Sequence, residues 1–158
     1  MQLLAFVSSA PQMGSSILVT KFAPQPPYED FLLQTDIYYV SPYTTSSTES
    51  PQVPALYRLS LGSGPAMTKQ LIASGIENMQ VQYGVLANGA VTFHDAAAVT
   101  AAAEWANVVA ARIWLLARST DAESGYSNTS TYAIGDQTIT AADGYPRQVF
   151  PLVVQLRR

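Results

Sequence analysis

Hydrophobic and polar residues alternate over several short stretches of this chain, which is the pattern of strands with one buried face. In residues 76–85 the apolar residues share one side and the amides share the other: Met79, Val81, Tyr83 and Val85 against Asn78, Gln80 and Gln82. Asn88-Gly89 follows and predicts a tight turn. Residues 36–40 and 55–61 predict two further strands, and residues 68–73 fit either a strand or a turn of helix.

Residues 108–118 carry the most information, because one face of this predicted strand is wholly apolar and the other is mixed. Arg112, Trp114 and Arg118 lie on the mixed face. Such a strand should be central in its sheet and covered by an amphipathic element.

The last predicted strand spans residues 147–157, with Phe150, Leu152, Val154 and Leu156 expected on its inward side. Pro151 has no N–H to donate to a ladder, so the strand should lie at an edge or be bulged there.

One helix is expected between these strands. Asp95 can cap it, residues 96–104 are rich in alanine, and it should end near Asn107. Three stretches read as loops because of their Pro, Ser and Thr content: residues 23–27, 41–54 and 119–130. Seven or eight strands and one helix indicate a β-rich α+β fold, with residues 1–158 forming a single domain.

Composition narrows the function classes. The chain is 48% hydrophobic and only 12% charged, which excludes a disordered protein. Its net charge of −3 gives no electrostatic footprint for nucleic acid. It has no cysteine, and no apolar run reaches the length of a membrane helix.

Candidate chemistry is sparse. His94 is the only histidine and reads as an exposed residue beside the helix cap. Asp121 and Glu123 share a loop but lack the spacing of a calcium-binding loop. A hydrolase built on scattered carboxylates remains an alternative, although no acid and base converge. We therefore predict no catalytic, cofactor or metal site, and a protein that is not an enzyme.

Several segments in order resemble the C-terminal domain of type IV pilus minor pilins of the PilW family. They are residues 38–40, 54–58, 75–84, 105–119, 131–132, 147–150 and 153–157. The resemblance implies a pilin-like antiparallel sheet, with the family's N-terminal hydrophobic helix absent from this chain. That helix would supply the cover for one face of residues 108–118, and the only membrane contact.

The same resemblance implies a structural protein that joins other minor pilins, primes pilus assembly and stays at the tip. Its expected partners are other minor pilins, the major pilin and a large tip adhesin. Its expected location is the inner membrane and periplasm, and then the extracellular pilus of a Gram-negative bacterium. A type II secretion pseudopilin would share this architecture and differ in its assembly partner.

Protein interfaces favour arginine, tryptophan and tyrosine. Arg112, Trp114 and Arg118 are therefore our candidates for contact with the helix or a partner, although they could equally just cover the sheet. Tyr38, Tyr39, Tyr43 and Tyr57, together with the Ser/Thr-rich loop 41–54, are candidates for an alternative function as an adhesive module that contacts a surface or a glycan. The competing interpretation is that these tyrosines are half-buried packing residues.

Overall fold

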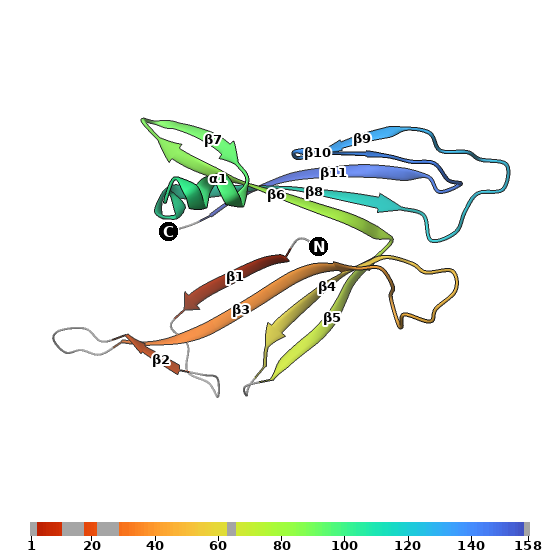
Figure 1. Ribbon diagram of the computed structural model, residues 1–158. Helices are drawn as coiled ribbons and strands as arrows, with labels where there is room; N and C mark the ends of the chain where they lie inside the picture. Colours follow the sequence, from red (N-terminus) through yellow and green to blue (C-terminus); the bar gives the residue numbers. More distant parts are fainter. Residues whose placement is uncertain (1–2, 11–17, 22–28, 63–65, 157–158) are drawn as a thin grey trace.

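The computed structural model describes residues 3–10, 18–21, 29–62 and 66–156, and their side chains from residue 35 onward. Within these ranges the chain forms eleven strands, one α-helix and one 3-10 helix (Figure 1). The first five strands are β1 (Leu3–Ala10), β2 (Leu18–Lys21), β3 (Glu29–Ser41), β4 (Ala55–Leu61) and β5 (Met67–Ser74). The others are β6 (Ile76–Ala87), β7 (Ala90–His94), β8 (Val108–Arg118), β9 (Thr131–Ile134), β10 (Gln137–Thr140) and β11 (Arg147–Gln155).

The strands form three antiparallel sheets instead of the single sheet that we expected. The first has the order β1-β3-β4-β5, with β2 also paired to β3, and the second has the order β11-β8-β6-β7. Strands β9 and β10 form a separate hairpin. Figure 1 shows the first sheet in the lower half of the molecule and the second sheet, the hairpin and the helix in the upper half. The β-rich α+β class is confirmed.

The regularly alternating segments were predicted correctly. Residues 55–61 and 108–118 are β4 and β8, and residues 36–40 and 76–85 lie inside β3 and β6. Strand β8 is central, as expected. Residues 68–73 belong to a strand, which settles the open alternative. The expected count of seven or eight strands was too low, while the loop predicted at 23–27 lies outside the described residues.

The helix α1 (Ala96–Ala101) is capped as predicted, since the Asp95 side chain accepts a hydrogen bond of 2.7 Å from the Ala98 N–H. It ends earlier than expected. Ala103 adopts a φ of 55°, and the Glu104 N–H turns back to the Val99 carbonyl at 3.0 Å. This is a Schellman-type stop built on alanine instead of the usual glycine. A short 3-10 helix, Trp105–Asn107, then leads into β8.

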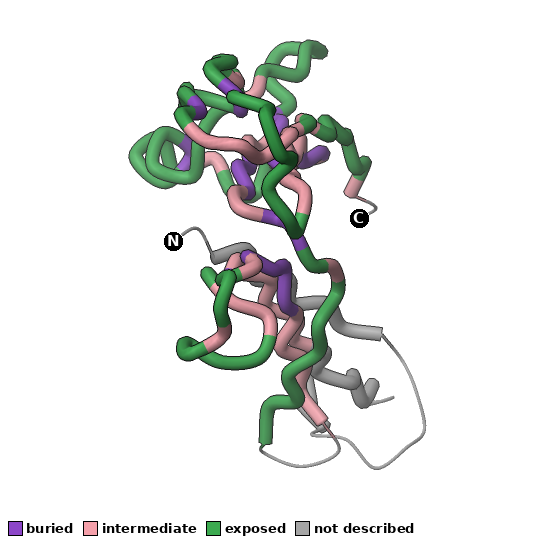
Figure 2. The backbone as a smooth tube through the Cα atoms, turned by 90° about the vertical axis from the view of Figure 1, so that its right-hand side faces the viewer, coloured by how far each residue is buried: buried purple, intermediate pink, exposed green. Residues whose placement is uncertain are grey.

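The hydrophobic core lies between the first and second sheets. Its buried members are Leu56 of β4, Ile76, Met79 and Val81 of β6, and Ala111 of β8. Partly buried side chains pack around them: Tyr38, Val40, Ala73, Tyr83, Ile113, Leu115 and Ala117. Figure 2 shows buried backbone at the level where the two halves of the molecule approach each other. The two sheets therefore share one core.

The opposite face of β6 is also covered, which the sequence did not lead us to expect. Gln80 lies on the amide side of the strand, yet only 4% of it is exposed. The β9–β10 hairpin covers it, because an added Cβ at Gly135 would lie 3.2 Å from the Gln80 Cβ and 3.5 Å from the Trp114 ring. Ile134 of the hairpin is fully buried. The prediction of one buried face was therefore wrong for β6.

A single glycine joins the two large sheets. Gly75 separates β5 from β6 and has a φ of 81°, which side chains rarely permit. Its N–H donates to the Pro54 carbonyl at 2.6 Å, and its carbonyl accepts from the Arg118 N–H at 2.8 Å. An added Cβ would lie 2.6 Å from the Arg118 carbonyl oxygen. The crossing between the sheets thus requires glycine for two independent reasons.

We predict that Gly75→Ala lowers the free energy of unfolding by at least about 2 kcal/mol, since backbone strain and a clash with fixed backbone add together. Urea denaturation would measure the loss. Gly89→Ala is the matched control, because Gly89 has a similar φ of 79° but open space where its Cβ would point. That variant should lose only about 1 kcal/mol. Equal losses would show that the contact with Arg118 contributes nothing.

Candidate interaction surfaces

The three arginine and tryptophan candidates share one face of β8 but do not meet in one site. Arg112 lies with its guanidinium carbon 3.9 Å from the centre of the Phe93 ring and 5.8 Å from that of Trp114. Arg118 lies at the end of the strand, 4.1 Å from the centre of the Tyr145 ring. Their roles are therefore different.

Arg118 contributes to a charged cluster beside the sheet junction. Its Nη2 donates to the Gln52 carbonyl at 2.7 Å, and its Nε lies 3.8 Å from the Glu77 carboxylate. Glu77 also accepts a hydrogen bond of 2.7 Å from Arg147, which binds Asp143 through both terminal nitrogens at 2.6 and 2.7 Å. The cluster ties the loop before β4, the start of β6 and the start of β11 to the end of β8.

The charges in this cluster stabilise one another. Hydrogen bonds from Arg147 lower the pKa of Asp143 from 3.8 to about 2, against a smaller opposing effect of burial. The same hydrogen bonds raise the pKa of Arg147, whose side chain is only 7% exposed. Sequence reasoning missed Glu77, Asp143 and Arg147, because the first and last are 70 positions apart.

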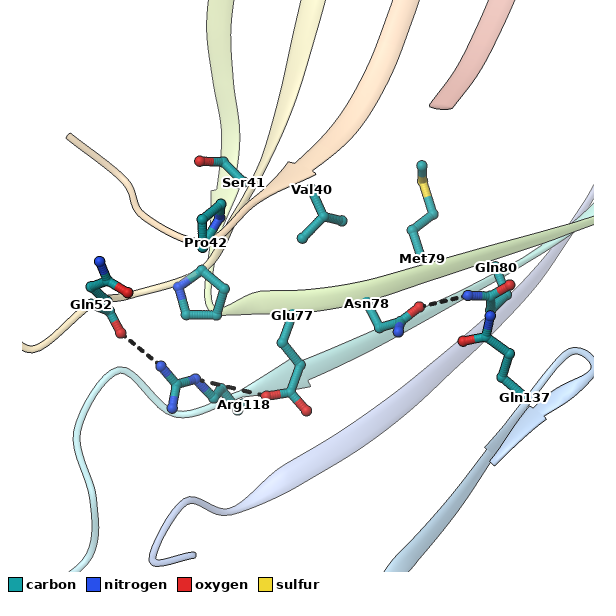
Figure 3. A pocket seen from close by; sticks show the side chains of 11 residues that line it. Val40, Ser41, Pro42, Gln52, Glu77, Asn78, Met79, Gln80, Arg118 and Gln137 are labelled. Atoms are coloured by element: carbon teal, nitrogen blue, oxygen red, sulfur yellow. Dashed lines mark hydrogen bonds and ion pairs between the residues drawn. The ribbon is translucent and has the colours of Figure 1, made fainter. Parts of the chain in front are cut away.

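A groove of about 510 Å³ lies next to the cluster, between the segment around Pro42 and the start of β6. Figure 3 shows Arg118 bridging Gln52 and Glu77 at one end, and Asn78 bound to Gln80 at the other. Among the described residues, Glu77 is the one carboxylate that lines this groove, and it is already paired with arginine. The groove therefore brings no general acid and base together.

The loop predicted at residues 41–54 has no helix or strand from residue 42 onward, whereas Ser41 is the last residue of β3. One carboxylate orders this loop. Glu49 accepts hydrogen bonds from the N–H groups of Thr44, Thr45 and Val53 and from both threonine hydroxyls, at 2.7 to 3.0 Å. The backbone donors, Val53 foremost, lower the pKa of Glu49. The loop is thus ordered around the Glu49 carboxylate.

Two of the four tyrosine candidates pack on each other. The rings of Tyr39 and Tyr57 are stacked with their centres 5.6 Å apart, and the Lys69 ammonium lies 3.8 Å above Tyr57. Tyr57 is 4% exposed and its hydroxyl donates to the Thr44 carbonyl, which anchors the loop. Tyr38 is partly buried and packs against the core. The stacked pair accordingly supports the first sheet and its loop.

Strand β11 is the edge of the second sheet, as the proline predicted. The Leu156 N–H donates to the Val109 carbonyl, and the Ser119 N–H donates to the Pro146 carbonyl. Because ladder hydrogen bonds recur at every second residue, the even-numbered residues of β11 are those that bond to β8. The backbone nitrogen of Pro151 consequently points away from β8, toward the open edge of the sheet. No strand of the described residues lies on that side, so the missing N–H removes no ladder hydrogen bond.

The side chains that we expected on the inward side of β11 do lie on the core-facing side of the sheet, but the expected burial is wrong for three of them. Phe150, Leu152 and Val154 are 47%, 40% and 40% exposed. Phe150 and Leu152 pair with Leu115 and Ile113, which places them on the core-facing side of the sheet. The first sheet packs over β6 and β8. The β11 side chains lie beyond the area that this sheet covers, so apolar surface continues past the packed core. We call Ile113, Leu115, Phe150, Leu152 and Val154 the apolar face.

The remaining candidates form no site. His94 is exposed and bonds to the Thr92 hydroxyl at 3.0 Å, consistent with our interpretation. Within the described part of the chain, no three acidic or histidine side chains gather to hold a metal ion. No helix in these ranges is long and apolar enough to cross a membrane.

A model of the family described as type IV pilus-assembly protein W, PilW, matches residues 37–158. The chain belongs to the PilW family. No curated protein and no solved structure gives a significant match. The match shows a role in type IV pilus assembly, which implies contact with other pilus components and association with the cell envelope or the pilus. PilW is a family of assembly proteins and not a known family of enzymes.

The matched region begins inside β3 and includes every surface described above. The sheet junction, the charged cluster and the apolar face therefore all lie in the PilW-like part of the chain.

For the charged cluster we predict that Asp143→Asn reduces the decrease in the free energy of unfolding that acid pH causes. Because the folded-state pKa of Asp143 is depressed, its contribution is complete above pH 3.8 and is lost as the pH falls toward about 2. The free energy of unfolding of the variant should be about 1 kcal/mol lower than that of the unmodified protein at neutral pH, and the difference should be smaller near pH 2. Urea unfolding at several pH values would measure this, with the exposed Asp136→Asn as control. Parallel pH curves for Asp143→Asn and the unmodified protein would contradict the assignment.

For the loop we predict that Glu49→Gln speeds amide hydrogen exchange at Thr44, Thr45 and Val53 by about tenfold, because a neutral amide accepts these bonds less well. Exchange in β4 and β8 should not change. Ser47→Ala is the control, since Ser47 is exposed and the described hydrogen bond to it, from Gln52, reaches its backbone carbonyl, which alanine keeps. Unchanged exchange at these three amides would mean that the loop is ordered by other contacts.

Proposed function

We propose that this PilW-family chain is a structural minor pilin that joins a minor-pilin complex, primes type IV pilus assembly and remains at the pilus tip. The family match over residues 37–158 carries the proposal. The protein would work in the inner membrane and periplasm before assembly, and then in the extracellular pilus of a Gram-negative bacterium. Its partners would be other minor pilins, the major pilin and a large tip adhesin.

The apolar face supports an assembly role. Contiguous exposed apolar side chains on a folded domain mark surfaces that another protein element covers. Phe150, Leu152 and Val154 extend the packed core beyond the first sheet without cover from the described residues. We propose that an amphipathic helix covers this face in the assembled complex, as the resemblance to minor pilins implies.

The shared core supports a single domain over residues 1–158, since Leu56 of the first sheet packs with Met79 and Val81 of the second. One cooperative unfolding transition is the expected behaviour of such a unit.

A type II secretion pseudopilin would use the same surfaces with a different partner, so only binding separates the two functions. The adhesive function receives less support from the tyrosines, because Tyr57 is buried and Tyr39 is stacked on it.

Size-exclusion chromatography with light scattering tests the proposed function directly. The protein would be measured alone and mixed with the other minor pilins and the adhesin of its own source, and in parallel with pseudopilins. A defined heteromeric peak with the pilus components supports the minor-pilin role. A peak with pseudopilins alone moves the function to secretion, and binding to neither overturns the assembly proposal.

Within that complex we predict that Leu152→Ser weakens association at least about tenfold, because it places a hydroxyl in the apolar face. Leu71→Ser is the matched control, since Leu71 is 47% exposed, close to the 40% of Leu152, and lies on the edge strand β5 of the first sheet. Thermal unfolding would verify that both variants fold. Equal affinities for the two variants would show that the apolar face takes no part in assembly.

A further inference from the structure

We propose that Arg112, whose guanidinium carbon lies 3.9 Å from the centre of the Phe93 ring and 5.8 Å from that of Trp114, is a docking point for a carboxylate side chain of a partner protein. The inference rests on the proposed function in assuming a protein partner, and it adds the chemistry of the group that this partner presents. We call the three side chains the arginine clamp. It lies on the face of β8 opposite the apolar face.

The clamp is built by three strands. Arg112 and Trp114 are two residues apart on β8 and therefore share a face. Phe93 comes from β7, on the far side of β6. Between them lies Gly84, where an added Cβ would sit 2.9 Å from Val91 and 3.1 Å from the Phe93 ring. The glycine thus leaves the space in which the Phe93 ring lies beneath the guanidinium.

Arg112 differs from the other arginines whose contacts are described. Arg58, Arg118 and Arg147 each lie within 4.0 Å of a carboxylate. Among the described residues, Arg112 has neither an ion pair nor a hydrogen bond from its guanidinium, and its contacts are the two aromatic rings. A guanidinium that lies over a ring keeps its in-plane N–H groups available, and these match both oxygens of a carboxylate.

The surroundings of Arg112 favour a partner carboxylate that is flanked by apolar side chains. Val153 is directly opposite Arg112 in the ladder and is 61% exposed, the largest value among the exposed large hydrophobic side chains. Val91, next to Gly84, is 44% exposed. Covering these side chains would exclude water from the ion pair and strengthen it. The rings also hold the guanidinium in place beforehand, which reduces the entropy lost on binding.

A phosphate would also satisfy the arginine fork. We favour a carboxylate because an acidic side chain between apolar residues matches both the free N–H groups and the exposed valine beside them. A phosphate alone would leave Val153 uncovered.

The test uses nuclear magnetic resonance of the isotopically labelled protein with a defined probe, the peptide acetyl-Leu-Glu-Leu-amide. We expect saturable shifts of the Arg112 Nε–H and Trp114 indole signals. The matched peptide with Gln in place of Glu should bind at least about fivefold more weakly, because it cannot pair both oxygens with the fork. Arg112→Lys should lower affinity for the Glu peptide by a similar factor, since lysine keeps the charge but loses the planar fork.

Arg58→Lys is the control variant, because Arg58 already pairs with Asp36 at 2.8 Å and should not contribute. Equal binding of the two peptides, unchanged affinity of Arg112→Lys, or absence of a saturable shift would each overturn the proposal. Tighter binding of inorganic phosphate than of the Glu peptide would reassign the clamp to a phosphorylated ligand. None of these results would affect the minor-pilin role, which co-elution with pilus components measures separately.

Discussion

The backbone crossing at Gly75 is the constraint on which the rest of the structure depends. Strands β5 and β6 are consecutive in the chain but belong to different sheets, and the glycine between them bonds to Pro54 on one side and Arg118 on the other. This fixes the first sheet over β6 and β8, which creates the common core. It also places the end of β8 beside the start of β6, so that Arg118 and Arg147 can share Glu77. Because the first sheet packs over β6 and β8, the apolar side chains of β11 extend beyond the packed area.

The sequence predicted those strands in which buried and exposed residues alternate one by one along the chain. Strand β8 was found with its full bounds because alternation along eleven residues leaves little doubt about its register. The β9–β10 hairpin was missed because its strands have four residues each and are mostly polar. A signal did exist, since Gly135-Asp136 is a two-residue hairpin turn between them. The helix end was misplaced because an alanine at Ala103 takes the position at which sequence rules look for glycine.

The candidate site was less predictable, because alternation assigns a residue to a face but does not identify its contacts. Arg112, Trp114 and Arg118 were correctly placed on one side of β8, yet they belong to two different arrangements. Arg118 binds Gln52, which is 66 positions away, and Arg112 lies on a phenylalanine from β7. Such contacts depend on strand order and on space, here the space at Gly84, and neither follows from local sequence.

The central strand β8 therefore separates two surfaces of different chemistry. Its core-facing side continues onto β11 as the apolar face, which suits an element that buries a broad area without strict orientation. Its other side carries Arg112 on two rings, a contact whose geometry is directional and which therefore favours specificity over affinity. Arg118 and Arg147 are paired with carboxylates inside the charged cluster and Arg58 is paired with Asp36, whereas Arg112 has no carboxylate partner among the described residues. Because the apolar face and Arg112 lie on opposite faces of one sheet, the two proposed contacts would not compete for the same residues.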